Sequence, residues 1–202
     1  MIQQQDRDLN LIAVVVGSNM IINDENILRA KNEEVTLEEV DILIQSLEKE
    51  LNYSMLMGRP GIGLACPQIG INKKAAIVRI GGSNNISINL VNAKIKKGYS
   101  PFLFKEEGCL SFNGKLNDTM RYQEIHVVDN AVEPHAFIAT GLIAVAIQHE
   151  LDHLDGILFF DRAVAKNPLN VKVRPNDPCI CGKLDILTGK VKKYKKCCGK
   201  GD

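Results

Sequence analysis

Two segments of the sequence carry apolar residues at the spacing of an α-helix. In the first, apolar residues recur every three or four positions, at Leu37, Val40, Ile44, Leu47 and Leu51. This spacing predicts an amphipathic helix over about 37–54, with Thr36 as N-cap and Glu39 completing a capping box. The second segment, 141–147, is apolar nearly all round, as is typical of a helix buried in a core, and Gly156 is expected to end it.

Shorter apolar or alternating stretches between turn residues predict β-strands. They lie at 74–80, 86–91, 93–98, 102–106, 122–129 and 135–139. Residues 81–85 read as a turn between the first two strands, and residues 1–20 as a polar leader with a short apolar run that fits an edge strand. Because the strands precede one buried helix, we predict an α+β fold with antiparallel sheets around that helix.

The end of the buried helix carries the pattern H-E-x-x-H within residues 148–153. On a helix, His149 and His153 project from one face, so their ring nitrogens can hold one metal ion. Glu150 lies beside such an ion without being a ligand, which lets it take a proton from a metal-bound water. Chance placement is the alternative, but burying two imidazoles without partners costs several kcal/mol. We therefore expect a metal site on this helix.

A catalytic metal site usually has three protein ligands and one open position for water. Cys109 is a candidate for the third ligand, as a lone cysteine beside Gly108 in a segment that reads as a strand. A buried structural cysteine is the common alternative for this residue type. Spacing alone does not favour Cys109 over Asp152, Asp155 or Cys66.

The composition is that of a soluble globular protein of 202 residues, with 45% apolar and 24% charged residues, long enough for one domain and an appendage. A net charge of +1 does not favour a nucleic-acid binder. No stretch is long and apolar enough to span a membrane, and the run 11–16 follows acidic residues rather than a basic leader. Isolated and closely paired cysteines fit metal binding in a reducing compartment, the cytoplasm, better than disulfides.

Three segments resemble the three sequence motifs of the peptide deformylases, in the order of that family. Residues 61–68 (G-I-G-L-A-C-P-Q) are similar to the first motif, 107–111 (E-G-C-L-S) match the second, and 148–156 (Q-H-E-L-D-H-L-D-G) match the third. The resemblance extends more loosely from about Val14 to Val164, with an early Leu28-Arg29 and with Arg121 after the second motif. Three motifs in order are far more specific than any one of them.

The resemblance implies a deformylase fold and the removal of the formyl group from the N-terminal formyl-methionine of new polypeptides, with a metal-bound water as nucleophile. It implies the metal ligands Cys109, His149 and His153. It further implies Glu150 as general acid and base, and Gln68 with the backbone N–H of Leu110 as donors to the oxyanion. The implied cofactor is one divalent metal ion, iron(II) in most members, with nickel, cobalt or zinc as alternatives.

The residues around these motifs also indicate how a peptide would bind. Gly61 and Gly63 let an extended peptide backbone lie close to their loop. An apolar pocket for the methionine side chain, with simple core packing as the alternative, is expected from Ile62, Val145 and Ala146, and Gly108 is assigned to substrate binding with them.

Two features depart from the family pattern. Cys66 stands where the family usually has alanine, and we expect it to raise the sensitivity to oxidation. Residues 112–117 replace the proline and the basic residue that many members have there.

The last part of the sequence carries a second metal-binding pattern. Its four cysteines are Cys179, Cys181, Cys197 and Cys198, enough for a closed tetrahedral zinc site. The segment resembles the small zinc-binding motif at the C-terminus of the bacterial preprotein translocase ATPase (SecA), although the spacing between the pairs is longer here. We therefore divide the chain into a catalytic domain, 1–168, and a zinc-binding tail, 169–202. This tail bears nine Lys and Arg against three Asp. The resemblance implies contact with ribosomes or chaperones, and the basic charge suits an anionic ribosomal surface.

Two other interpretations stay open from the sequence. H-E-x-x-H is also the signature of zinc peptidases, which usually take their third ligand from downstream of the motif, where few candidates follow here. An adaptor with an inactive core would fit the tail. The intact set of candidate catalytic residues argues against it: Gln68, Cys109, His149, Glu150 and His153.

Overall fold

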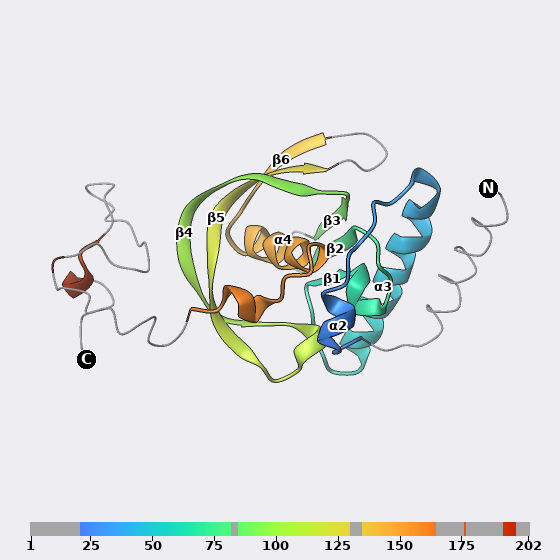
Figure 1. The fold of residues 1–202 in the computed structure, drawn as a ribbon, viewed down its shortest axis with the longest axis horizontal. Helices are drawn as coiled ribbons and strands as arrows, with labels where there is room; N and C mark the ends of the chain where they lie inside the picture. The colour runs from blue at the N-terminus through green and yellow to red at the C-terminus, as the bar shows by residue number, and fades with distance from the viewer. Residues whose placement is uncertain (1–20, 82–84, 130–134, 165–175, 177–191, 197–202) are drawn as a thin grey trace.

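Figure 1 shows the chain as a computed structural model. The structure describes residues 21–81, 85–129, 135–164, 176 and 192–196. The predictions for residues 1–20 and for the four cysteines of the tail lie outside these residues. Within the tail, the described part includes one short 3-10 turn, η5 (Tyr194–Lys196).

Helical elements form the N-terminal part of the described chain. They are α2 (Glu25–Leu28), the 3-10 turn η1 (Leu37–Glu39) and α3 (Val40–Leu56). The predicted helix over 37–54 is confirmed, with its first turn tightened to 3-10 geometry. Its start is fixed as expected, because the carboxylate of Glu39 accepts a hydrogen bond from the backbone N–H of Thr36 at 2.9 Å. The apolar face of α3 lies in a core cluster through Leu43, Leu47 and Leu51.

A first antiparallel sheet has the order β1-β2-β3. Its strands are β1 (Gly63–Ala65), β2 (Ala75–Ile80) and β3 (Ile86–Val91), and the 3-10 turn η2 (Cys66–Ile69) follows β1. Successive residues of β2 face opposite sides. Ala75 and Ile77 belong to the cluster with α3, whereas Ala76 and Val78 belong to the cluster with α4. This middle strand is therefore apolar on both faces, which explains its continuous run.

A second antiparallel sheet has the order β4-β5-β6. Its strands are β4 (Lys94–Gly108), β5 (Leu116–Asp129) and β6 (His135–Thr140). The two strands predicted at 93–98 and 102–106 are one strand, and β5 begins earlier than predicted. Gly98 and Pro101 lie where the two predicted strands were separated, and Pro101 is tolerated because β4 is an edge strand of this sheet. Gly98 is needed because any Cβ there would overlap the ring of Tyr122.

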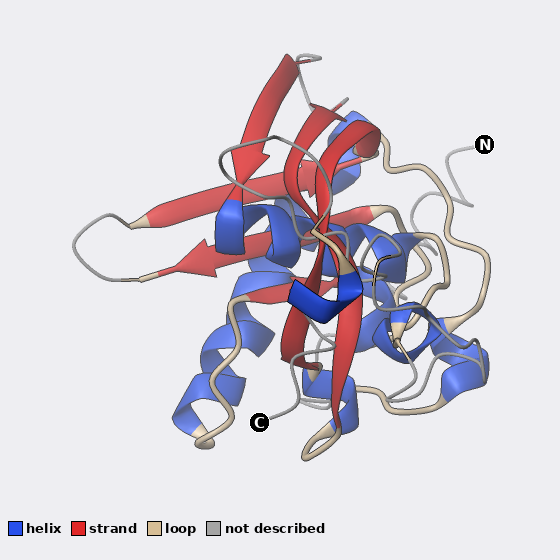
Figure 2. Cartoon of the chain, turned by 90° about the vertical axis from the view of Figure 1, so that its left-hand side faces the viewer, coloured by secondary structure: helices blue, strands red, loops and turns tan. Residues whose placement is uncertain are grey.

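α4 (Gly141–Leu154) lies between the two sheets, as Figures 1 and 2 show. It packs on both sheets, so the predicted α+β fold with antiparallel sheets around the H-E-x-x-H helix is confirmed. Its burial is less complete than its apolar sequence indicated, because Leu142 is 51% exposed. Gly156 follows in a left-handed conformation with φ of 70°, which ends the helix as predicted. None of the helices in the described ranges is long and apolar enough to cross a membrane.

Candidate active site

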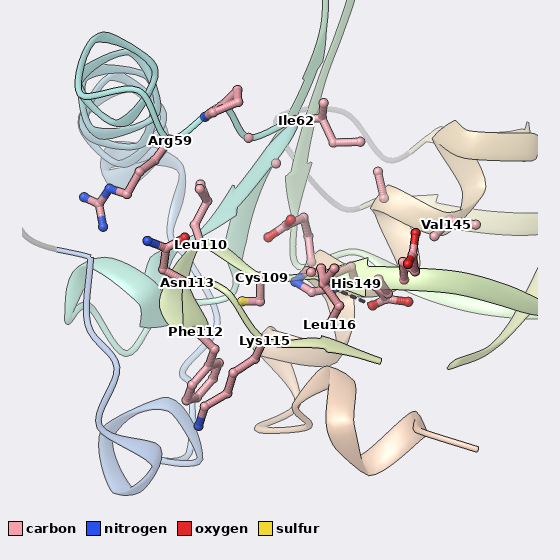
Figure 3. Close-up of a pocket in the computed structure, with 18 of the residues that line it drawn as sticks. Arg59, Ile62, Cys109, Leu110, Phe112, Asn113, Lys115, Leu116, Val145 and His149 are labelled. Atoms are coloured by element: carbon pink, nitrogen blue, oxygen red, sulfur yellow. Dashed lines mark hydrogen bonds and ion pairs between the residues drawn. The ribbon is translucent and has the colours of Figure 1, made fainter. Parts of the chain in front are cut away.

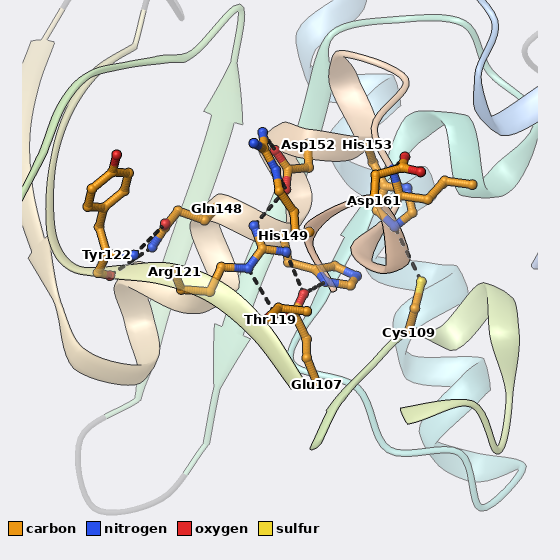
Figure 4. Close-up of polar contacts among 12 residues, drawn as sticks. Glu107, Cys109, Thr119, Arg121, Tyr122, Gln148, His149, Asp152, His153 and Asp161 are labelled. Carbon is orange, nitrogen blue, oxygen red and sulfur yellow. Dashed lines mark hydrogen bonds and ion pairs between the residues drawn. The ribbon is translucent and has the colours of Figure 1, made fainter. Parts of the chain in front are cut away.

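Three potential metal ligands meet where the end of β4 approaches α4. His149 and His153 project from α4, and Cys109 directly follows β4, ahead of the 3-10 turn η3 (Leu110–Phe112). Their ligand atoms all lie within 4.8 Å of one another. The Sγ of Cys109 is 3.3 Å from Nε2 of His153, as Figure 4 shows. The geometry brings together the three residues that the family resemblance implied.

The other candidates for the third ligand have different surroundings. Asp152 forms ion pairs with Arg121 at 2.6 Å and with Arg162, of η4 (Phe159–Arg162), at 2.8 Å. Asp155 lies 3.7 Å from Nζ of Lys74. Cys66 is fully buried in the core cluster with α3, and burial raises the pKa of its thiol to about 12. A thiol in that state is protonated and shielded, which argues against the expected sensitivity to oxidation.

Glu107 orients the first histidine, a role absent from the sequence-based predictions. Its Oε1 accepts a hydrogen bond from Nδ1 of His149 at 2.6 Å, as Figure 4 shows. The same carboxylate accepts from Nε of Arg121 at 2.8 Å and from the hydroxyl of Thr119 at 2.5 Å. Because a carboxylate only accepts, Nδ1 of His149 carries the proton and Nε2 is left for a metal. The signal in the sequence was the position of Glu107 two residues before Cys109, on the same face of a strand.

These contacts set the charge states around the site. Burial raises the pKa of Glu107, but hydrogen bonds from His149 and Arg121 outweigh it and hold the pKa at about 2. Burial lowers the pKa of His149, whereas hydrogen bonds with Cys109 and Glu107 raise it well above its ordinary value. Burial and the charge of His149 lower the pKa of His153 well below its ordinary value. His153 is therefore neutral, the form in which imidazole binds a metal, whereas a metal on Nε2 of His149 would displace the proton held there.

Glu150 is the buried carboxylate beside these ligands. Its side chain packs against Gly63 of β1, where a Cβ would overlap Oε1. Burial raises the pKa of Glu150 to about 7, and the charge of His149 opposes that rise. A carboxyl group with a pKa near neutrality can both accept and return a proton, as a general acid and base must.

Gln68 and Leu110 border the site from the other motifs. The Oε1 of Gln68 accepts from the backbone N–H of Ala65 at 2.9 Å, which fixes which end of the amide donates. Its Nε2 lies 3.5 Å from Sγ of Cys109 and 3.2 Å from the hydroxyl of Ser111. Leu110 directly follows Cys109, and its side chain occupies the space beside Gly61. Both candidate oxyanion donors are therefore close to the thiol of Cys109.

A cavity of about 490 Å³ opens onto the site. Its lining includes every residue predicted to bind substrate: Gly61, Ile62, Gly63, Gly108, Val145 and Ala146. Gln68, Cys109, His149 and Glu150 border the same cavity. Figure 3 shows Val145 on one side of His149 and Leu110 on the other. The volume exceeds that of a single methionine side chain, which leaves space for more of a peptide.

The donor set fits a divalent transition-metal ion. One thiol and two imidazoles converge on one point, and such donors suit iron, nickel, cobalt or zinc rather than magnesium or calcium. The hydrogen bond from His149 to Glu107 is the kind of supporting contact that metal-bound histidines usually make.

Three potential metal ligands on and beside a buried helix, a neighbouring buried carboxylate and a cavity that reaches them are the parts that a metal-dependent hydrolase needs. The family model for polypeptide deformylase matches residues 18–168. The chain therefore belongs to the peptide deformylase family, whose members depend on a metal ion and remove the N-formyl group from nascent polypeptides.

Individual relatives agree with the family match. The chain is 39% identical to the peptide deformylase of Picosynechococcus sp. over 142 residues, which cover 68% of this chain and 74% of that protein. It is 40% identical to peptide deformylase 1 of Bacillus subtilis over 132 residues, which cover 62% of this chain and 80% of that protein.

Solved structures show the same fold. The structure is similar to Arabidopsis thaliana peptide deformylase 1B in complex with an inhibitor, with a TM-score of 0.64 and 32% identity, over 75% of this chain and 84% of that one. It is also similar to the class I type b peptide deformylase of Acinetobacter baumannii bound to Met-Ala-Ser, with a TM-score of 0.61 and 28% identity, over 70% and 96% of the two chains.

Proposed function

We propose that Cys109, His149 and His153 hold the metal ion for deformylation and that Glu150 is its general acid and base. The observation that carries this assignment is the convergence of the three ligand atoms within 4.8 Å, beside a buried carboxylate. Cys109, His149 and Glu150 all border the cavity, so a formyl group that enters it would reach an ion held there.

When bound, the ion polarises a carbonyl oxygen and lowers the pKa of a coordinated water to about 7. Glu150 would take a proton from the water that attacks the formyl carbon and would return it to the amine as the C–N bond breaks. Formate and a free methionine amine are the products. The Nε2 of Gln68 and the backbone N–H of Leu110 donate to the oxyanion. Loss of one such donor typically costs about 2.7–4 kcal/mol of transition-state stabilisation.

The remaining cavity residues would position the peptide. Gly61 and Gly63 border the cavity beside β1, and their missing Cβ atoms leave room for the side chains of Leu110 and Glu150. Ile62, Val145 and Ala146 give an apolar surface for the methionine side chain, and Gly108 borders the formyl end. The lining of one cavity by both groups supports this assignment.

We propose iron(II) as the resident ion, in line with the family resemblance. One thiolate and two imidazoles also accept nickel, cobalt and zinc. Metal analysis of protein purified under anaerobic conditions tests this directly, and a sample that holds zinc alone while releasing formate at full rate would contradict it.

The assignment of Glu150 is tested by formate release from a formyl-Met peptide and by metal content, measured together. Glu150→Gln should keep the metal and lose at least about 100-fold in kcat, the lower range of acid–base catalysis. Cys109→Ala should lose both the metal and the activity. Glu34→Gln, a change of the same kind at an exposed site, is the matched control.

Glu150→Gln and the wild type separate the alternatives. A Glu150→Gln protein that retains wild-type formate release would refute the acid–base role. A wild-type protein that binds metal but cleaves internal peptide bonds instead of releasing formate would refute deformylation by this site.

For the tail, 169–202, we propose a structural zinc ion held by Cys179, Cys181, Cys197 and Cys198. The two cysteine pairs and the excess of Lys and Arg in the sequence support this proposal and a tether to an anionic surface such as the ribosome. Such a tether would keep the enzyme in the cytoplasm where new chains emerge. Ribosome co-sedimentation of the full chain should exceed that of 1–168 and fall with salt; equal co-sedimentation would exclude the tether.

A further inference from the structure

The cavity extends beyond the space that a formyl-methionine fills, and two cations border this extension. Arg59 and Lys115 line the same cavity as Cys109 and His149. Figure 3 shows both on the side of Cys109 that is opposite to Val145. They come from different segments, the loop between α3 and β1 and the loop between η3 and β5. The extension is therefore flanked by positive charge from two walls.

Neither cation is neutralised by a neighbouring acid. Among the described residues, Arg59 and Lys115 have no carboxylate within ion-pair distance, and Nζ of Lys115 lies 5.3 Å from the centre of the Phe112 ring. The backbone of Arg59 is fixed, because its N–H and its C=O both bond to Ser54 at the end of α3, at 2.9 and 2.7 Å. Glu106 also lines the cavity, and it offsets part of this charge.

The direction of a bound peptide follows from the position of the chemistry. β1 is an edge strand of its sheet in the described structure, and residues 61–63 border the cavity. The formyl end must lie at Glu150, which packs against Gly63. A peptide paired with this edge therefore extends from Gly63 towards Gly61 and then Arg59, at about 3.3 Å per residue. Its third residue would lie opposite Gly61, two positions along the chain from Arg59.

We propose that Arg59 and Lys115 make the enzyme prefer nascent chains with an acidic side chain at the third residue. This inference rests on the proposed function of the site. Exposed charge pairs have modest effects that salt screens. With two cations acting on opposite charges, the ratio of kcat/KM between a Glu and a Lys substrate should be about five at low salt and below about two in 0.5 M NaCl.

The test uses the metal-loaded full chain and amidated formyl-Met-Ala-X-Ala peptides, with X as Glu, Gln or Lys. In the double variant Arg59→Gln, Lys115→Gln, the Glu-to-Lys ratio should fall to about one. The double variant Lys94→Gln, Lys96→Gln removes the same charge from exposed positions outside the cavity lining, and it should keep the wild-type ratio.

The outcomes distinguish the charge preference from the proposed deformylase function on which it rests. Formate release from the Gln peptide by the wild type tests the proposed function alone, and its absence would remove both. If the wild type releases formate but its Glu-to-Lys ratio of kcat/KM is near one, only the charge preference is overturned. So would equal loss of the ratio in the two double variants, because the effect would then come from net charge rather than from these two side chains.

Discussion

The substitution Glu107→Gln should weaken both the fold and the metal site. An amide has one acceptor oxygen, so it cannot serve Arg121, Thr119 and His149 together. The pKa of Glu107 is about 2 against an ordinary 4.5, which corresponds to about 3 kcal/mol of folding free energy at pH 7. Breaking a buried ion pair typically costs about 3–5 kcal/mol, which agrees. For a chain of this size, 3 kcal/mol lowers Tm by about 6–12 °C.

The pH dependence of this effect has a defined sign. Because the pKa of Glu107 is lower in the folded than in the unfolded chain, its stabilisation is complete above a pH of about 4.5. It is lost as the pH falls from there towards 2. Wild type and Glu107→Gln should therefore differ most in Tm near neutral pH and approach each other in acid.

The assay combines thermal unfolding with competition for the metal by a chelator. His149 loses its fixed acceptor, so metal affinity should fall by about 10- to 100-fold. Glu106→Gln, the exposed neighbour on β4, is the control and should leave Tm unchanged. A Glu107→Gln protein that melts within about 2 °C of the wild type and holds its metal as tightly would refute the reasoning.

Three further results are expected. Gly63→Ala places a methyl group where Oε1 of Glu150 lies, so formate release should fall by about 100-fold, whereas Gly81→Ala has open space and should be neutral. Iodoacetamide at about pH 8 should modify Cys66 only after unfolding, as peptide mass spectrometry can check, because burial raises the pKa of its thiol to about 12. The fragment 1–168 should bind about one metal ion and release formate, while the full chain binds one additional zinc; a fragment without metal would contradict the two-site division.

The elements that follow a single local period were predictable from the sequence. The helices at 37–54 and from 141 show the period of 3.6, and the strands near 74–80 and 86–91 lie between clear turn residues. The long strand β4 was not predictable in one piece. Gly98 and Pro101 are unfavourable in an isolated strand, and only the ring of Tyr122 and the edge position of β4 explain them.

The candidate site likewise has a part that the sequence predicted and a part that it did not. The pair His149 and His153 is a local pattern on one helix, so spacing alone indicated a metal. The contact of Glu107 with His149 joins residues 42 positions apart and depends on how β4 and α4 meet. A register shift between Phe104 and Glu107 adds to this, because it changes which β4 residues face inward. Such irregularities come from pairing between strands, and a linear pattern does not encode them.

The segment Glu107-Gly108-Cys109 shows how two periods build one site. Residues two apart in an extended chain share a face, and Cys109 is still extended, with φ of −139° and ψ of 137°. The strand therefore presents an orienting acid and a metal ligand to the same side. On α4, His149 and His153 are four residues apart, so both project from the helix face that is directed at Cys109. A side chain at Gly108 would press on Leu116, its pairing partner on β5. Inserting one residue between Glu107 and Cys109 would thus turn one of them away, so the metal site depends on strand register as much as on its ligands.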